Sequence, residues 1–219
     1  LALSAMFTLV FSYVVRVPTD GIPYPIFSYT ALVPWTFLSS AINLGVPSLV
    51  NNMNLITRIY FPREILPLAS IAAAGIDFGV AALVLAGMMM WYHMPLHPAL
   101  LLLPVLVLIQ AILAFGATLL GAAALVFFRD VRFIVPLFLQ LWLYASPVIY
   151  PVSQIPAQWR PIYQLNPMVG VLESYRDILL RQRWPDPAAL ASAALIALAL
   201  FVLGYWLFKR LEPRFADLI

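Results

Sequence analysis

The sequence predicts an all-α membrane protein with six transmembrane helices and an amphipathic or re-entrant helical segment between the fifth and the sixth. Of its 219 residues, 64% are hydrophobic and only 10% are charged, whereas soluble domains carry about 25% charged residues. The apolar runs are 17 to 30 residues long, which suits membrane helices better than membrane strands of about 9–11 residues. We therefore expect one transmembrane domain over residues 1–219.

Six spans follow from length and hydropathy. They are Leu1–Val17, Ile26–Val50, Ile65–Trp91, Ala99–Phe128, Phe133–Tyr150 and Ala188–Phe208. The first begins inside an apolar run with no charged region before it, so we expect it to be the second part of a helix whose start is missing. Pro34 lies inside the second span and predicts a kink there.

The longest polar break in the first half of the chain is the connector, residues 51–64, which reads NNMNLITRIYFPRE. Basic residues favour cytoplasmic loops. With the C-terminal tail inside, residues 51–64, 129–132 and 209–219 hold seven of the twelve basic residues. This orientation places the connector in the cytoplasm, where its apolar residues and arginines predict docking on a partner. The alternative is a linker that rests on the lipid surface.

Prolines interrupt the segment between the fifth and sixth spans, residues 151–187. Five prolines occur in the stretch that begins with Pro147 and ends with Pro167, so no continuous helix crosses this region. Asn166 before Pro167 predicts the start of a helix, with asparagine as the N-cap and proline in the first turn. The helix should run to about Leu180.

This short helix is amphipathic. Glu173, Arg176 and Asp177 fall opposite its apolar residues, and the pairs Glu173–Arg176 and Asp177–Arg181 have the favoured spacing and order. We expect the helix to lie at the outer interface as an anchor, or to dip into the membrane as a gate over an exit path.

Aromatic residues crowd the outer end of the fifth span and the segment after it: Trp142, Tyr144, Tyr150, Trp159 and Tyr163. Such residues commonly form a belt at the membrane interface. The second interpretation is that they stack on sugar rings along an exit path.

Asp77 is the one acid deep within a predicted span. An ionisable group there is costly unless it faces a polar interior or a partner. It lies between Gly75 and Gly79, whose spacing allows close approach of helices. Asp77 is therefore either an ion or proton site or a hydrogen-bonded contact between spans.

Several classes of chemistry find no support in the sequence. It contains no cysteine and no phosphate-binding loop, and its nine acids are scattered. We therefore expect no catalytic residues, no bound metal and no nucleotide site in this chain. The net charge of +3 does not indicate nucleic-acid binding.

Three blocks resemble the permease subunit of type-2 ABC exporters for polysaccharides, in particular the O-antigen and teichoic acid exporters. The blocks are NLITRIYFPREILPL, FRDVRFIVPLFLQLWLYASPVIYP and NPMVGVLESYR. The resemblance covers essentially the whole chain in the right order. It implies a homodimer of six-span permeases in the cytoplasmic membrane, with two ABC ATPase subunits that bind ATP and Mg²⁺.

The same resemblance implies roles for particular residues. The connector would be the coupling helix held in a groove of the ATPase, through Asn54, Leu55, Ile56, Arg58, Ile59, Tyr60, Phe61 and Arg63. Residues 151–187 would be the outer gate. The path and gate would use Trp142, Tyr144, Tyr150, Trp159, Tyr163, Glu173, Tyr175 and Arg176. ATP binding would move the connector, open a channel between two permeases and let a lipid-linked polysaccharide pass.

Other functions stay open at this point. The chain is alternatively an ABC permease for a drug or lipid, or an ion-coupled secondary transporter that uses Asp77. A membrane enzyme that acts on polyprenyl-linked sugars lacks a candidate catalytic cluster.

Overall fold

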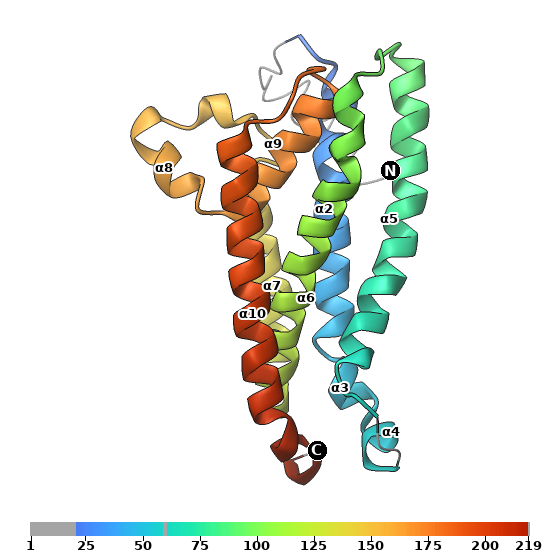
Figure 1. The fold of residues 1–219 in the computed structure, drawn as a ribbon, viewed down its shortest axis with the longest axis vertical. Coiled ribbons are helices and arrows are strands. Elements are labelled where there is room, and N and C mark those ends of the chain that lie inside the picture. The colour runs from blue at the N-terminus through green and yellow to red at the C-terminus, as the bar shows by residue number, and fades with distance from the viewer. Residues whose placement is uncertain (1–20, 59–60, 219) are drawn as a thin grey trace.

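The computed structural model describes residues 21–58 and 61–218, and within them every regular element is a helix (Figure 1). The elements are α2 (Tyr24–Gly45), α3 (Ser48–Asn51), α4 (Met53–Arg58), α5 (Ile65–Trp91), η2 (Pro98–Leu102), α6 (Leu103–Phe127), α7 (Val131–Tyr144), η3 (Val152–Gln154), η4 (Ala157–Trp159), α8 (Arg160–Tyr163), α9 (Pro167–Leu179) and α10 (Pro187–Leu218). The predicted helical class is confirmed for this part of the chain. The first predicted span lies outside the described residues.

Three helices in the described part of the chain are long and apolar enough to cross a membrane. They cover Ile65–Trp91, Pro98–Phe127 and Pro187–Phe215, and they coincide with the third, fourth and sixth predicted spans. Each contains an 18-residue window of high mean hydropathy with at most two charged residues, close to the length of about 20 residues that a bilayer requires. The chain is therefore a multi-pass membrane protein.

Two other predicted spans end earlier than the hydropathy suggests. α2 ends at Gly45 rather than Val50, and α3 follows as a separate short helix after Pro47. α7 ends at Tyr144 rather than Tyr150, shortly before Pro147. Its 14 residues reach about 21 Å at the usual rise per residue. Proline, which lacks the N–H that a helix needs, explains both early ends.

The core lies around α2, which packs against α5, α6 and α9. Ile26, Leu38 and Ala41 are fully buried on this helix. Pro34 occurs within the helix, as predicted, and its carbonyl accepts a hydrogen bond from Nε2 of the buried Gln110 on α6. The polar residue that interrupts the fourth apolar run thus fastens α6 to the proline site of α2.

Two long helices, α6 and α10, approach each other closely at a glycine. A Cβ atom on Gly116 would lie 2.6 Å from the backbone of Phe201, so only glycine fits there. The predicted close approach at Gly75 and Gly79 is wrong for the described residues, because a Cβ on Gly79 would have no neighbour within 4 Å.

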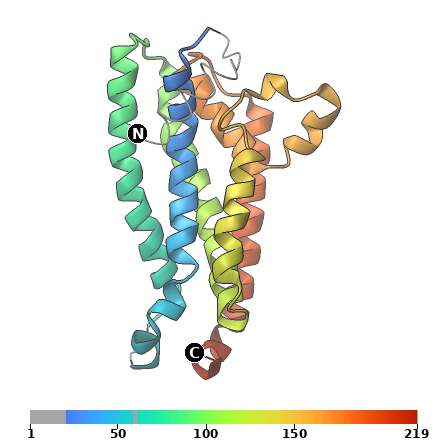
Figure 2. The same ribbon diagram turned by 180° about the vertical axis from the view of Figure 1, so that it is seen from behind.

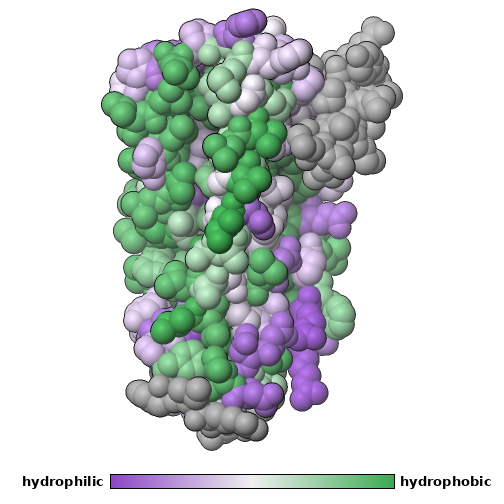
Figure 3. All heavy atoms as spheres, turned by 90° about the vertical axis from the view of Figure 1, so that its right-hand side faces the viewer, coloured by the Kyte–Doolittle hydropathy of each residue, from purple (hydrophilic) through white to green (hydrophobic). Residues whose placement is uncertain are grey.

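The loops gather at two ends of the bundle (Figures 1 and 2). The connector, the α6–α7 turn and the C-terminal tail share one end, which we call the connector end. The α5–α6 loop and the segment that contains α8 and α9 share the other, which we call the proline-rich end. Figure 3 shows apolar side chains over much of the surface between them.

Candidate functional site

The connector end brings together the three loops that the sequence placed on one side. Nζ of Lys209 lies 2.8 Å from Oε2 of Glu64 and 3.0 Å from Oε2 of Glu212. Arg63 donates to the carbonyl of Glu212, so the end of the connector is tied to the C-terminal tail. The predicted grouping of these loops is therefore confirmed.

Electrostatics support this tie between the connector and the tail. Burial opposes ionisation of Glu64, but the hydrogen bond and the positive charge of Lys209 outweigh it and lower the pKa of Glu64 below its ordinary value. Glu64 is therefore ionised at neutral pH. Arg63 was expected to pair with acids on a partner, but here it contacts the tail of its own chain.

The connector itself forms α3 and α4 before the chain turns into α5. Asn54 and Leu55 are exposed, and Leu55 keeps 42% of its surface accessible. Phe61 is half-buried and packs on the cluster that contains Phe208 and Phe215, so it is shared with the internal packing. The side chains of Ile56 and Arg58, and all of Ile59 and Tyr60, lie outside the described residues.

At the proline-rich end, Asn166 begins α9 as the sequence predicts. Its Oδ1 accepts from the backbone N–H of Met168 and from Nε1 of Trp142, each at 3.0 Å. Its Nδ2 donates to the carbonyl of Ala145 and to the hydroxyl of Ser146, at 3.1 and 2.9 Å. One asparagine thus caps the helix and holds the end of α7 in place.

Arg176 lies at the centre of a buried charged network. Its side chain is fully buried, with Nη1 2.9 Å from Oε1 of Glu173 and Nη2 3.0 Å from the carbonyl of Val148. The guanidinium stands 3.8 Å from the ring centroid of Phe27 on α2, a cation–π contact. Arg176 therefore joins α9 to α2 and to the turn after α7.

The rest of the network lies beside Arg176. Arg181 Nη1 contacts Oε2 of Glu173 at 2.7 Å and Oδ1 of Asp177 at 2.8 Å, and Arg183 Nη2 contacts Oδ1 of Asp177 at 2.8 Å. Burial opposes ionisation of Glu173, yet Arg176 and Arg181 lower the pKa of Glu173 below its ordinary value. Both predicted ion pairs are confirmed.

The first of the two positions expected for α9, at the outer interface, needs correction. An interfacial helix would turn its charged side outward, but Arg176 and Asp177 are buried, and so are nearly all other residues of α9. The polar side is covered because the turn after α7 offers its carbonyls to Arg176. α9 is therefore packed inside the protein and does not lie on a lipid surface.

Three of the predicted path residues line one groove. The groove has a volume of about 520 Å³ and includes Trp142, Trp159 and Tyr163 among its lining residues. Trp159 on η4 is 55% exposed. Burial and the hydrogen bond with Tyr150 raise the pKa of Tyr163 above its ordinary value, so its hydroxyl stays protonated and donates to that of Tyr150 at 3.1 Å.

The other predicted path tyrosines differ among themselves. Tyr150 donates to the carbonyl of Tyr144 at 2.9 Å and so braces the turn below the groove, and Tyr144 is 53% exposed. Tyr175 is buried, with its hydroxyl 3.5 Å from Oε1 of Gln110. Tyr175 therefore belongs to the core and does not line the groove.

A polar strip on α2 escaped the sequence analysis. Thr36 and Asn43 are exposed, and Ser39 and Ser40 between them are partly exposed, although the rest of the helix is mostly buried. The recurrence of small polar residues at intervals of three to four in the second apolar run was the signal for one polar helix face. Such a face is unfavourable against lipid and suits a polar path.

Asp77 lies apart from both ends. It is exposed on α5 between Ile76 and Val80, which are 72% and 61% exposed. Within the described ranges, no hydrogen bond or ion pair to Asp77 is found, so the expected contact between spans is not seen there. The same residues contain no group of three or more histidine, cysteine or acidic side chains that could hold a metal.

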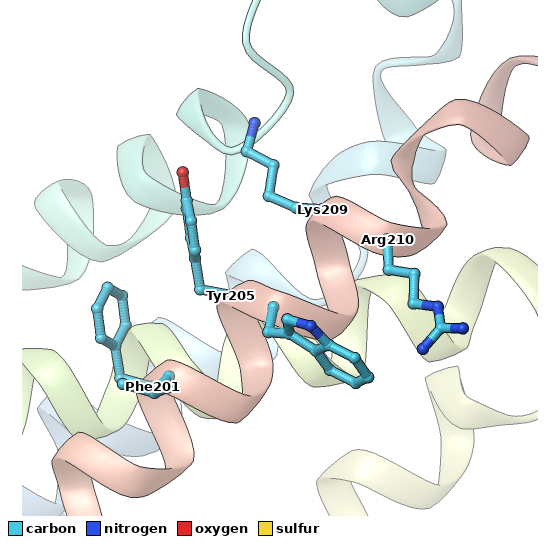
Figure 4. A pocket seen from close by; sticks show the side chains of 6 residues that line it. Phe201, Tyr205, Lys209 and Arg210 are labelled. Carbon is cyan, nitrogen blue, oxygen red and sulfur yellow. The ribbon is translucent and has the colours of Figure 1, made fainter.

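A second groove runs along α10 near the connector end (Figure 4). It has a volume of about 540 Å³ and is lined by Phe201, Val202, Tyr205, Trp206, Lys209 and Arg210. Lys209 and Arg210 stand 5.8 and 5.2 Å from the rings of Tyr205 and Trp206. Aromatic and basic residues in this order are typical of a membrane interface.

Known proteins resemble this chain over nearly its whole length. Residues 1–180 match the family model described as ABC-2 type transporter. The chain is 30% identical over 217 residues to the O-antigen export system permease protein RfbA of Myxococcus xanthus, covering 98% of this chain and 82% of the relative. It is 26% identical over 220 residues to the protein of the same name from Klebsiella pneumoniae, covering 100% and 84%. It is also 24% identical over 210 residues to the polysialic acid transport protein KpsM of Escherichia coli, covering 93% and 79%.

Proposed function

The chain belongs to the ABC-2 type transporter family, and on that premise we propose that it is the membrane subunit of an ATP-driven exporter for a lipid-linked polysaccharide. The names of its relatives, which refer to O-antigen export and polysialic acid transport, support this cargo class. The protein would be located in the cytoplasmic, or inner, membrane. Six spans would cross it, with α2 and α7 as the second and fifth.

The observation that carries the proposal is the polar strip on α2. A sugar chain needs hydrogen-bonding groups along a path through the membrane, and hydroxyl and amide side chains provide them without charge. Thr36, Ser40 and Asn43 are three to four residues apart and follow one face of α2. The aromatic groove at the proline-rich end would receive the sugars next, because sugar rings stack on indole and phenol rings.

A second copy of the chain would complete the path. Ile134, Leu137, Phe138 and Leu141 on α7 are 58%, 59%, 56% and 62% exposed and recur at helical spacing. This apolar face is suited to contact the same face of a partner copy. A homodimer with the strip between its halves would enclose a wider path than one chain can.

The energy source would be a pair of ABC ATPase subunits that bind ATP and Mg²⁺. The exposed Asn54 and Leu55 of α4, with Ile56, Arg58, Ile59 and Tyr60 beside them in sequence, would dock in a groove of that partner. The motion of the ATPase would reach α5 and α10 through the contacts of Glu64, Lys209 and Arg63, because these contacts tie the connector to both helices.

The proposal is tested by making the strip apolar. We expect Ser40→Leu with Asn43→Leu to reduce polysaccharide at the cell surface by on the order of tenfold or more, because two polar contacts to the cargo are lost. Copurification with the ATPase should be unchanged. Leu198→Ile, an apolar change on α10 at a residue that is 50% exposed, is the matched control.

The result also separates the alternative cargoes. Normal export by the double variant would contradict the assignment of the path to α2. Loss of drug or phospholipid transport, with polysaccharide export intact, would replace the glycan by a smaller cargo. Asp77→Asn should leave export unchanged, whereas loss of ATP-independent transport in that variant would favour an ion-coupled mechanism.

A further inference from the structure

The groove on the exposed side of α10 is built from two parallel rows of side chains (Figure 4). One row is Phe201, Tyr205 and Lys209, and the other is Val202, Trp206 and Arg210. Residues four positions apart lie on one face of a helix, so the two rows run side by side along the helix axis. Within the described part of the chain, no other helix contributes to the lining of this groove.

The chemistry of the two rows changes in the same order along the axis. Each row begins with an apolar residue, continues with an aromatic residue that carries an O–H or N–H group, and ends with a cation. From residue 201 to residue 210 the helix advances about 14 Å at the usual rise of about 1.5 Å per residue. This length is close to half of a hydrocarbon core of roughly 30 Å. The groove therefore matches a molecule with an apolar chain, a polar linkage and an anionic head.

The surroundings of the groove place its ligand in the bilayer. The groove lies on Pro187–Phe215, which is long and apolar enough to cross a membrane. Val202 and Trp206 in the groove are 57% and 53% exposed, and the adjacent Leu203 is 52% exposed. Apolar side chains that are exposed on a membrane-crossing helix contact lipid. A lipid molecule is therefore the neighbour that this groove meets first.

The cationic end of the groove has one charge that the chain does not compensate. Nζ of Lys209 lies 2.8 Å from Oε2 of Glu64 and 3.0 Å from Oε2 of Glu212. No ion pair to Arg210 is found among residues 21–58 and 61–218, where its guanidinium stands 5.2 Å from the ring of Trp206. A guanidinium binds two oxygens of one phosphate in a bidentate manner. The groove therefore suits a ligand with a single negative charge.

We propose that this groove binds an anionic phospholipid, namely phosphatidylglycerol from the leaflet at the connector end. Arg210 would hold the phosphodiester, and Tyr205 and Trp206 would lie beside the glycerol esters. One acyl chain would extend along the groove toward Phe201. A zwitterionic phospholipid carries an ammonium group, which Arg210 and Lys209 would repel, so the site favours a lipid with a net negative charge.

A bound lipid would also affect the tie between the connector and the C-terminal tail. Lys209 lines the groove and at the same time contacts Glu64, which directly precedes α5. A lipid in the groove fills the space into which the side chain of Lys209 could otherwise turn. We therefore expect added phosphatidylglycerol to raise the thermal unfolding temperature of the wild type more than that of Arg210→Gln.

Native mass spectrometry of the full-length chain, purified in detergent and titrated with phosphatidylglycerol, tests the inference. We expect Arg210→Gln to weaken binding on the order of tenfold, because one charge-assisted contact is lost, and Arg210→Lys to weaken it less. The matched control is Arg129→Gln, which removes an exposed cation at the same end but outside the groove. It should bind like the wild type, and equal weakening in both variants would overturn the groove as the site.

Two competitors define the ligand. Phosphatidylcholine, which has no net charge, and glycerol 3-phosphate, which has no acyl chain, should each displace phosphatidylglycerol poorly. Equal displacement by phosphatidylcholine would overturn the anionic head, and equal displacement by glycerol 3-phosphate would overturn the apolar part of the site. Absence of binding to the wild type, with dissociation of Trp206→Ala into single chains in light scattering, would assign the groove to a second copy. The assay uses neither ATP nor polysaccharide, so its failure leaves the exporter assignment intact.

Discussion

At the proline-rich end the side chain of Arg176 is fully buried, whereas at the connector end Lys209 keeps 33% of its side chain exposed. Both residues contact acids at 2.8 to 3.0 Å. The buried network ties α9, α2 and the turn after α7 into one unit. Removing one of its members would leave the charge of its partner buried and uncompensated. The charged groups at the connector end stay partly exposed. The difference indicates a rigid proline-rich end and a more adaptable connector end.

The largest effect should follow removal of Arg176. We expect Arg176→Ala to lower the free energy of unfolding by about 3–5 kcal/mol, because Glu173 and the carbonyl of Val148 lose their partner in a buried site. Denaturant unfolding in detergent, followed by circular dichroism, measures it. Arg183→Ala is the matched control: Arg183 contacts the same network with 61% of its side chain exposed and should cost about 1 kcal/mol or less. Equal losses of unfolding free energy in both variants would contradict a rigid proline-rich end.

The second largest effect should be a loss of stability of the proline-rich end at acidic pH. The pKa of Glu173 is lowered from an ordinary value of 4.5, so the stability that its ionised form contributes is complete above that value. It is lost as the pH falls through the lower pKa of the folded state. The melting temperature measured from neutral to acidic pH should therefore fall below pH 4.5. Glu173→Gln should flatten this part of the profile, and an unchanged profile would show that other acids cause the fall.

Two apolar connector residues should separate stability from docking. Phe61→Ala should lower the free energy of unfolding by about 2 kcal/mol, roughly half the cost for a fully buried phenylalanine, because Phe61 is half-buried against the cluster of Phe208 and Phe215. Leu55→Ala should leave stability unchanged and reduce ATPase copurification, since Leu55 is exposed. Thermal unfolding and copurification of both variants check this, and the reverse pattern would overturn the division of roles.

Removal of Lys209 should lower stability less than removal of Arg176 or Phe61. Its contacts to Glu64 and Glu212 are partly exposed, so Lys209→Ala should cost about 1 kcal/mol or less. Added salt should reduce the difference between variant and wild type in thermal unfolding, because salt screens exposed pairs. A loss of stability as large as that of Arg176→Ala would show that the connector end is as rigid as the proline-rich end.

Local patterns predicted much of this molecule. The long apolar runs predicted α5, α6 and α10, and Asn166 with Pro167 predicted the start of α9. The spacing of Glu173 with Arg176 and of Asp177 with Arg181 predicted both ion pairs. These features depend on residues within a few positions of one another, and for that reason the sequence alone is sufficient.

The sequence patterns were less informative about what covers each face. One expectation placed the charges of α9 at the outer interface, but the turn after α7 and Phe27 enclose Arg176. The glycines that permit close packing are Gly116 and Gly204, not the pair around Asp77. Periodicity reveals that a helix has two faces, but it does not identify the neighbour that packs on either one.

The sequence by itself determined that this chain is a helical membrane protein with a polar connector and a proline-punctuated segment before its last helix, because hydropathy, helix length and proline act locally. Only the tertiary structure decided that Arg132 meets Asn51 and that Arg63 meets the carbonyl of Glu212, 81 and 149 residues apart. Such contacts depend on how whole helices pack together. The tie between the connector and the C-terminal tail and the buried network around Arg176 both arise from packing of this kind.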